Sequence, residues 1–287
     1  MGACVRVSSA ERGARGALVA ALAVIVSGCS VRNLVAVDPY PCSVSDASGC
    51  VPSLLDDLIG FWRLDDAPGS TTARDGSEWH NDGTLVGIDP ASAWVAGGAQ
   101  GGALSVEDSG YVSVPRSASI DSISTQVTVA AWIYLDGAVT TYATAMSRQI
   151  GTSFEQHYHL SVNSQNQAIL FITTPASGQV VMGGPMNFPQ QTWVHLAGTY
   201  DGSRARLYVD GVEVINMPVS GAFASETDPL ILSGNGNGSA QTVTELVPGR
   251  LDEVVLYRRA LGATEIARLK NGALAAAIGS ATDAAGP

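Results

Sequence analysis

The sequence predicts an all-β fold, a sandwich or barrel of antiparallel strands followed by one short helix. Three observations support this prediction. Apolar residues alternate along residues 127–135, an Asp-Gly pair at Asp210 separates two alternating runs, and turn-forming residues divide most of the other apolar runs. Alternation directs one set of side chains into a core, and many short runs between turn residues are typical of sandwiches and barrels.

The composition fits a folded domain and excludes several classes of protein. The chain has 287 residues, of which 46% are hydrophobic and 14% charged, so it can bury a core and is not disordered throughout. Its four cysteines are too few for a disulfide-built scaffold. The net charge of −11 argues against a nucleic-acid partner, because such binding uses lysine and arginine to neutralise phosphates.

Residues 1–28 are predicted to be a lipoprotein signal peptide. Arginines precede a short apolar run, which has fewer than the roughly 20 residues that a membrane-spanning helix needs. A Ser-Gly pair directly before Cys29 resembles the bacterial lipobox, and this resemblance implies a diacylated Cys29 as the mature N-terminus. An ordinary secretory peptide cut nearby is the alternative. Ser30 is not the Asp that often marks inner-membrane retention, so we expect an exported lipoprotein anchored in the outer membrane or at the bacterial cell surface.

Residues 29–55 are expected to form a stalk, because prolines and a Ser/Asp/Gly cluster interrupt any sustained period. Cys42 and Cys50 lie in this stalk, and an even pair in an exported chain favours a local disulfide over two free thiols. Residues 272–287 are rich in Ala and Gly and are predicted to be a flexible tail. The folded domain is therefore expected at residues 56–271.

Within the domain, the apolar pattern predicts strands and one helix. Asp210-Gly211 supplies the two positive-φ positions of a tight hairpin turn. The helix is predicted at residues 263–270, with Gly262 as its N-cap and arginine and lysine near its C-terminal end. The predicted strands are residues 58–64, 102–107, 110–114, 127–135, 156–163, 167–173, 178–182, 192–200, 207–209, 212–215, 229–233 and 250–257.

An ordered set of these stretches resembles the LamG-like jelly-roll domain of the concanavalin A-like lectin/glucanase superfamily. The stretches are residues 58–66 (LIGFWRLDD), 81–85 (NDGTL), 111–115 (YVSVP), 127–133 (VTVAAWI), 193–202 (WVHLAGTYDG), 207–211 (LYVDG), 251–254 (LDEV) and 259–261 (RAL). The resemblance implies a concanavalin A-like jelly-roll sandwich of two antiparallel sheets, one of them concave, with the last strand returning beside the first. It does not define a ligand, because such domains bind sugars, bind proteins or act as spacers.

The alternation in strands 127–135 and 156–163 also predicts a ligand-binding face. The side chains that point away from the core, and that we expect to bind the ligand, are Trp132, Tyr134, His157, His159 and Asn163. If both strands lie in the concave sheet, aromatic rings meet amide and imidazole groups, a mixture that binds sugars by stacking and hydrogen bonding. The alternatives are a crossing loop that buries Trp132 and an ordinary solvated face for the two histidines, since two ligands alone do not make a metal site.

A calcium site is a further expectation, because the resemblance implies a Ca²⁺ near the rim of the sandwich. Such an ion takes six to eight oxygen ligands. The predicted ligands are Asp65, Asp66, Asp82 and Asp252. Alternation places Asp252 on the core face with Val254 and Leu256, where a buried carboxylate needs Ca²⁺, an arginine or backbone N–H groups as a partner.

The sequence argues against catalysis. Retaining glycosidases need two carboxyl groups about 5–5.5 Å apart. Asp252 and Glu253 are adjacent, so strand alternation would send them to opposite faces. We therefore expect a non-catalytic cell-envelope binding module that recognises carbohydrate on the concave sheet. The alternative is a structural or adhesive surface protein that docks an envelope or extracellular protein.

Overall fold

The computed structural model describes residues 53–107, 110–149, 156–225, 228–236 and 242–285. The predictions for the signal peptide and for Cys29, Cys42 and Cys50 concern residues outside these ranges. No helix within the described ranges is long and apolar enough to cross a membrane.

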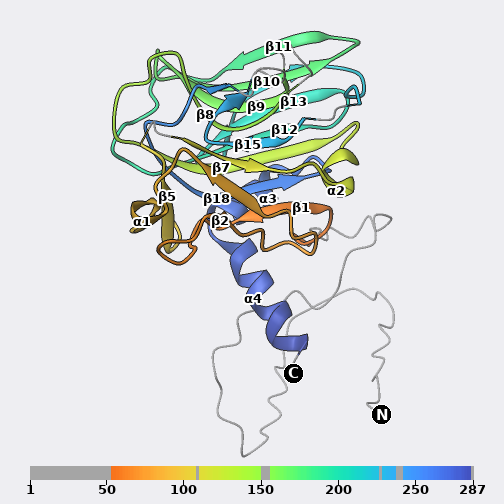
Figure 1. Ribbon diagram of the computed structural model, residues 1–287. Helices are drawn as coiled ribbons and strands as arrows, with labels where there is room; N and C mark the ends of the chain where they lie inside the picture. The colour runs from red at the N-terminus through yellow and green to blue at the C-terminus, as the bar shows by residue number, and fades with distance from the viewer. Residues whose placement is uncertain (1–52, 108–109, 150–155, 226–227, 237–241, 286–287) are drawn as a thin grey trace, which may run out of the picture. The chain divides into compact units, whose positions relative to one another are not determined.

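Two antiparallel sheets form the domain, and the last strand returns beside the first (Figure 1). The first sheet has the order β14-β13-β12-β7-β18-β5-β4, with β1 paired to β18. Its strands are β1 (Leu58–Trp62), β4 (Trp94–Ala96), β5 (Gly102–Ser105), β7 (Val127–Leu135), β12 (Val194–Tyr200), β13 (Arg204–Val209), β14 (Val212–Pro218) and β18 (Gly249–Tyr257). This arrangement confirms the predicted sandwich and the pairing that the resemblance implies.

The second sheet has the order β11-β10-β9-β8-β15-β6-β3-β2. Its strands are β2 (Thr72–Ala73), β3 (Gly83–Val86), β6 (Tyr111–Val114), β8 (Tyr142–Gln149), β9 (Gln156–Asn163), β10 (Ala168–Thr174), β11 (Gly178–Gly183) and β15 (Leu230–Leu232). The short elements outside the two sheets are β16 (Asn235–Gly236), β17 (Val243–Thr244), α1 (Pro90–Ala93) and α2 (Ala118–Asp121).

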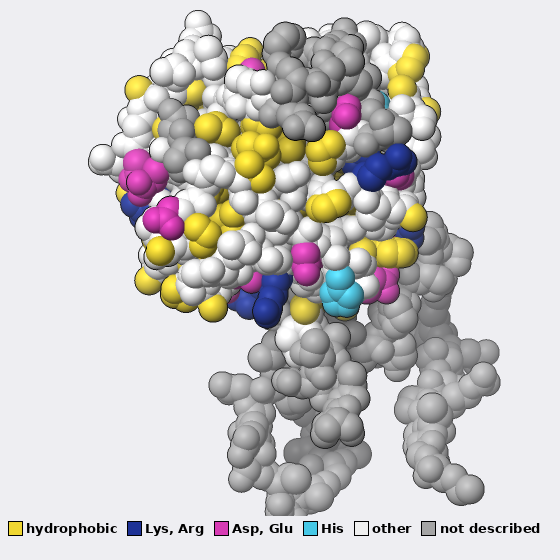
Figure 2. Space-filling view, in the orientation of Figure 1, with side chains coloured by type: hydrophobic (Ala, Val, Ile, Leu, Met, Phe, Trp, Pro, Cys, Tyr) yellow, Lys and Arg dark blue, Asp and Glu magenta, His cyan; other side chains and the backbone are white. Residues whose placement is uncertain are grey.

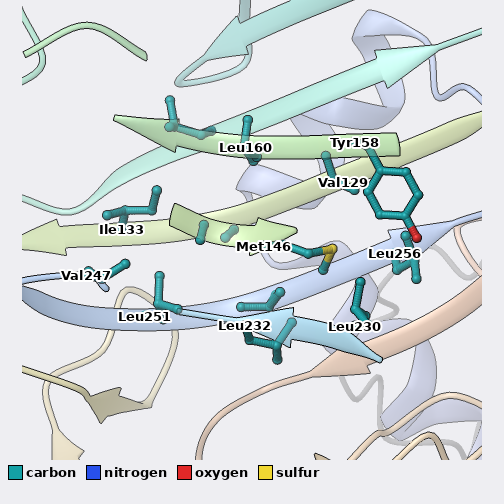
Figure 3. Close-up of a cluster of buried hydrophobic side chains, with 14 of the residues drawn as sticks. Val129, Ile133, Met146, Tyr158, Leu160, Leu230, Leu232, Val247, Leu251 and Leu256 are labelled. Atoms are coloured by element: carbon teal, nitrogen blue, oxygen red, sulfur yellow. The ribbon is translucent and has the colours of Figure 1, made fainter. Parts of the chain in front are cut away.

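The main hydrophobic core lies between the two sheets. Figure 3 shows Ile133 and Leu251 of the first sheet together with Leu160 and Leu232 of the second, and all four side chains are fully buried. Each buried side chain of this size contributes about 1.5–3 kcal/mol relative to an exposed one. The alternation predicted for β7 is confirmed, because its odd-numbered residues are buried and Trp132 is only half-buried.

Two helices follow β18, and the first of them covers part of the outer face of the first sheet. The first helix, α3 (Ala263–Lys270), has the predicted bounds, and the Gly262 N–H donates to Glu265 Oε2 at 3.0 Å at its start. A second hydrophobic cluster joins this helix to outward-facing residues of β7, β12, β13 and β18. The tail predicted to be flexible is instead helical over α4 (Ala273–Ala285), because alanine has the highest helix propensity and Leu274 packs into the same cluster.

Several charged side chains of the domain form ion pairs. Arg116 and Arg148 both contact the Asp121 carboxylate at 2.7 Å. Burial opposes ionisation of Asp121, yet the hydrogen bonds from these two arginines hold its pKa below the usual value. On the face drawn in Figure 2, acidic and basic side chains lie interspersed and are not separated by sign.

Candidate functional site

The predicted ligand-binding residues divide between two surfaces, because β7 and β9 belong to different sheets. Trp132 and Tyr134 lie on the outer face of the first sheet. His157 and His159 lie on the outer face of the second sheet, and Asn163 is at the end of the same strand. The core separates the two outer faces, since stacked sheets pack about 10 Å apart. The condition that both strands lie in one sheet is therefore not met, and the five residues do not share one face.

On the second sheet, His159 lies in a closed aromatic and polar cluster. Its ring stacks on Phe171 with centroids 4.7 Å apart, its Nε2 is 2.7 Å from Thr144 Oγ1, and its Nδ1 is 3.4 Å from Gln156 Oε1. Burial lowers the pKa of His159 to about 3, so the ring is neutral at physiological pH. His157 and His159 are 4% and 1% exposed, so the alternative of a solvated histidine face is also wrong.

On the first sheet, four rings form a surface that we call the aromatic platform: Trp132, Tyr134, Trp193 and His195. Trp132 faces His195 across the β7–β12 pairing, with ring centroids 5.3 Å apart, and Tyr134 and Trp193 are 5.4 Å apart. The guanidinium of Arg250 lies 4.8 Å from the Tyr134 ring centroid. Trp132, Tyr134 and Trp193 are half-buried, so part of each ring is open to solvent.

Trp193 and His195 were not predicted to lie on this surface, although alternation indicates that both face outward. The two residues alternate with Val194 and Leu196, which are buried in the core, so they share the outward face of β12. Their neighbours on that face could not be recognised, because β12 and β7 are far apart in the sequence.

Asp252 extends one row of the platform, and we call His195, Trp132 and Asp252 the polar row. The three residues occupy one register position across β12, β7 and β18. His195 Nδ1, Trp132 Nε1 and Asp252 Oδ1 are each buried without a hydrogen-bond partner. By contrast, each of the other four tryptophans donates its indole N–H to a backbone carbonyl oxygen. Buried polar atoms usually have partners, and in this row three neighbouring side chains each have an atom without one.

A glycine-rich loop at residues 97–101, between β4 and β5, reaches over the polar row. The Gln100 backbone N–H donates to Asp252 Oδ2 at 2.8 Å, and Trp193 Nε1 donates to the Gly97 carbonyl oxygen at 3.1 Å. The loop is therefore connected to both the polar row and the platform.

A β-bulge reverses the orientation that was predicted for Asp252. Asp252 stands opposite Trp132, but the pairing with β7 shifts by one residue before Val255. Glu253, with a φ of 48°, lies within this irregular stretch. The alternation changes phase there, so Asp252 lies on the outer face with Trp132, whereas Val254 remains in the core as predicted.

The bulge also makes Asp252 and Glu253 a buried acidic pair instead of two residues on opposite faces. They are 0% and 6% exposed. Burial is the main cause that raises the pKa of each to about 7, and the charge of Asp252 adds to the shift of Glu253. Arg63 Nε lies 3.5 Å from Glu253 Oε1 and offsets part of this effect.

The four predicted calcium ligands are linked electrostatically, because the charges of Asp82 and Asp65 both act on Asp66 and the charge of Asp65 acts on Asp252. The Asp65 charge contributes, after burial, to the raised pKa of Asp252, and the Asp82 charge contributes in the same way to that of Asp66. Asp65 is also paired with Arg63 at 2.8 Å. Among the described residues, no group of three or more His, Cys, Asp or Glu side chains is arranged to hold a metal ion. The calcium site stays a prediction.

A small pocket of about 200 Å³ lies beside the β4–β5 hairpin, where Asp65, Asp66 and Trp94 are among its lining residues. Pockets for drug-sized ligands usually measure about 300–1,000 Å³. A recess of this size does not hold an oligosaccharide, so the aromatic platform is the better candidate for one.

Two face-to-face antiparallel sheets, with the last strand paired to the first, form a β-jelly-roll sandwich. A profile of the Laminin_G_3 family, described as the concanavalin A-like lectin/glucanases superfamily, matches residues 106–267. The chain therefore belongs to this superfamily, which confirms the resemblance seen in its sequence. No curated protein matches the chain significantly in sequence.

Solved structures share the fold at low sequence identity. Domain 4 of AbnA, an extracellular GH43 arabinanase from Geobacillus stearothermophilus solved with arabinotriose, is 19% identical with a TM-score of 0.54, covering 75% of this chain and 98% of that one. The binding domain of Paraclostridial Mosquitocidal Protein 1 is 15% identical with a TM-score of 0.58, covering 77% and 53%. Trypanosoma rangeli sialidase with sialic acid is 17% identical with a TM-score of 0.54, covering 77% and 33%.

The chain thus spans about half of the mosquitocidal binding domain and a third of the sialidase. At these identities the likeness concerns the fold alone.

Proposed function

We propose that this domain is a non-catalytic module of the cell envelope that binds carbohydrate on the aromatic platform. The observation that carries this proposal is the set of half-buried rings of Trp132, Tyr134 and Trp193 in two adjacent rows. Such rings stack on the apolar faces of sugars, and the neighbouring polar groups bond to hydroxyls. The arabinanase domain of the same fold was solved with arabinotriose, which also supports a sugar ligand.

The burial of the acidic pair supports a non-catalytic role. Glycoside hydrolysis requires two carboxyl groups that flank the scissile bond. Asp252 and Glu253 have raised pKa values, but they are almost fully buried, and the Gln100 N–H already occupies one oxygen of Asp252. Arg63 Nε lies 3.5 Å from Glu253 Oε1, so both carboxyl groups already have partners inside the domain, which does not favour a pair that flanks a scissile bond.

Binding of the purified chain to a glycan array tests the proposal. The test variants are Tyr134→Ala and Trp193→Ala, which each remove one ring of the platform. Each is expected to weaken binding about tenfold, because loss of a stacked ring removes roughly 1–1.5 kcal/mol. Trp79→Ala is the matched control, since Trp79 is 41% exposed and lies outside the platform. If the array shows no bound glycan, or if Trp79→Ala weakens binding as much as the platform variants, the proposal fails.

Exposed apolar side chains favour a protein partner as the second candidate function. Val181 on β11 and Val212 on β14 are 49% and 64% exposed, and each lies on an edge strand. Met186 is 65% exposed. Exposed edge strands can pair with another chain. A blank glycan array, together with co-purification of one stoichiometric envelope protein, would favour this second function.

We also propose that Cys29 carries the lipid that anchors the domain to a bacterial membrane. The support is the apolar run and the Ser-Gly pair before this cysteine. Two or three acyl chains hold a protein firmly, at about 0.8 kcal/mol per buried CH₂. Intact mass of the mature protein is expected to show a diacylated or triacylated Cys29, and Cys29→Ala is expected to leave the membrane fraction. A Cys29→Ala variant that still sediments with membranes contradicts the anchor.

A further inference from the structure

We infer that the loop at residues 97–101 is a lid over a saccharide subsite, and that the polar row is the floor of this subsite. The inference rests on the proposed carbohydrate function and specifies how the sugar is recognised. In the structure the loop is closed, held by the Gln100 N–H on Asp252 Oδ2 and by the Trp193 indole on the Gly97 carbonyl. The Ala99 backbone also bonds to Asp252, but none of these bonds belongs to the β4–β5 pairing, so the loop can lift without unfolding a strand.

The glycines of the loop suit a hinged segment. Gly97 and Gly101 have φ values of +83° and +91°, which other residues rarely adopt, and a Cβ at Gly97 would meet no atom within 4 Å. Gly98 is different, because a Cβ there would collide with the Gly102 carbonyl and lie 2.7 Å from Asp252 Oδ2. The observed, closed position of the loop therefore requires glycine at residue 98.

The unpartnered atoms of the polar row match a hydroxyl group. Trp132 Nε1 can only donate, and the Asp252 carboxylate accepts. His195 Nδ1 can take either role in the neutral ring. A hydroxyl both donates and accepts, so one hydroxyl can bond to the indole N–H and to the carboxylate together. A sugar ring that stacks on Trp193 or Tyr134 places its hydroxyls next to this row.

The surrounding charges favour an uncharged saccharide over an acidic one. Near the row, Arg250 contacts Asp136 at 3.3 Å and Lys270 lies 3.9 Å from Asp210, so both cations already face a carboxylate. A ligand carboxylate would be a further acidic group beside the Asp252–Glu253 pair, and both of these cations are already engaged. The subsite therefore takes neutral sugars and discriminates against uronic or sialic acids.

A variant that cannot close the lid tests this inference. Gly98→Ala is expected to bind the preferred neutral trisaccharide about fivefold more tightly or better, because closure no longer competes with binding. The probes are arabinotriose, xylotriose, cellotriose and maltotriose, with trigalacturonic acid as the acidic counterpart. Gly137→Ala is the control, since a Cβ there meets no atom within 4 Å. Equal affinities of Gly98→Ala, Gly137→Ala and wild type would overturn the lid.

Trp132→Phe tests the floor even if Gly98→Ala does not fold. The substitution keeps an aromatic ring and removes an N–H that has no partner, so thermal stability is expected to stay within a few degrees of wild type. Affinity for the neutral trisaccharide is expected to fall about tenfold, because the bond to its hydroxyl is lost. In wild type, the indole N–H signal that this variant lacks should shift during the titration.

The outcomes separate this inference from the proposed function. If trisaccharide binding is lost in Tyr134→Ala while the Trp132 indole signal does not shift, the sugar binds the platform and the subsite is wrong. If trigalacturonic acid binds as tightly as the neutral probes, the assignment to uncharged saccharides is wrong. If no probe and no arrayed glycan binds wild type or Gly98→Ala, the carbohydrate function itself is wrong.

Discussion

Asp75→Ala is expected to destabilise the domain by about 4 kcal/mol or more, because it removes the acceptor of several buried donors. Asp75 is 4% exposed and lies in the segment that follows β2, opposite Trp62 of β1. Its carboxylate accepts the backbone N–H groups of Phe61 at 2.7 Å, Ser77 at 2.8 Å and Asn81 at 2.7 Å, and the Ser77 hydroxyl at 2.6 Å. Without it, three backbone N–H groups lack their acceptor, at about 1–3 kcal/mol each.

Denaturant unfolding of three variants measures this effect. Asp75→Asn keeps one acceptor oxygen and is expected to fall between wild type and Asp75→Ala. The matched control is Asp82→Ala, at an exposed aspartate whose side chain accepts the Asp75 N–H at 2.8 Å. We expect a loss of roughly 1 kcal/mol for this control. A loss for Asp75→Ala no larger than that for Asp82→Ala would show that the network around Asp75 is not needed for the fold.

Asp252→Asn is expected to become more stable relative to wild type as the pH rises from about 4 to 7. In the folded wild type, burial raises the pKa of Asp252 to about 7, whereas the unfolded chain ionises near 3.9. Between these values the folded state keeps a proton that the unfolded state has lost, so wild-type stability falls with rising pH. The slope is about 1.4 kcal/mol per pH unit, and asparagine removes it together with the part of the Glu253 shift that the Asp252 charge causes.

Two buried histidines have the opposite effect on the pH dependence of stability. The variant is therefore compared with wild type at each pH. Burial lowers the pKa of His159 and His195 to about 3, and stability is therefore lost as the pH falls below about 6.5. Both proteins contain these histidines, and their effect cancels in the difference of unfolding free energies. Glu78→Gln, at an exposed glutamate, is the matched control. Parallel stability profiles for Asp252→Asn and wild type would contradict the raised pKa of Asp252.

Much of the strand content could be predicted, and the exceptions have a physical cause. β7 and β9 have the predicted bounds, and Asp210-Gly211 forms its turn with φ values of 49° and 81°. β8 was not predicted, because its sequence YATAMSRQ is rich in Ala, Ser and Thr and shows no run of large apolar residues. It is a strand because it pairs with β9 on one side and β15 on the other.

The candidate site was predictable only in part. Trp132 and Tyr134 were identified by alternation, and they do face outward. The closed cluster around His159 was not foreseen, because the sequence does not show that Phe171 stacks on this ring. Nor could it show that Trp193 and His195 join Trp132 and Tyr134, since cross-strand neighbours come from distant parts of the chain.

The sequence by itself determined which side chains of β7 and β9 face the core, because alternation is a local property of an extended chain. It also determined the Asp-Gly hairpin and α3, whose signals lie within a few residues. Only the tertiary structure decided which sheet each strand joins, since long-range pairing leaves no period in either strand. It placed β7 and β9 in different sheets. The bulge near Glu253 then moved Asp252 to the outer face, because a shift of one residue reverses the direction of a side chain.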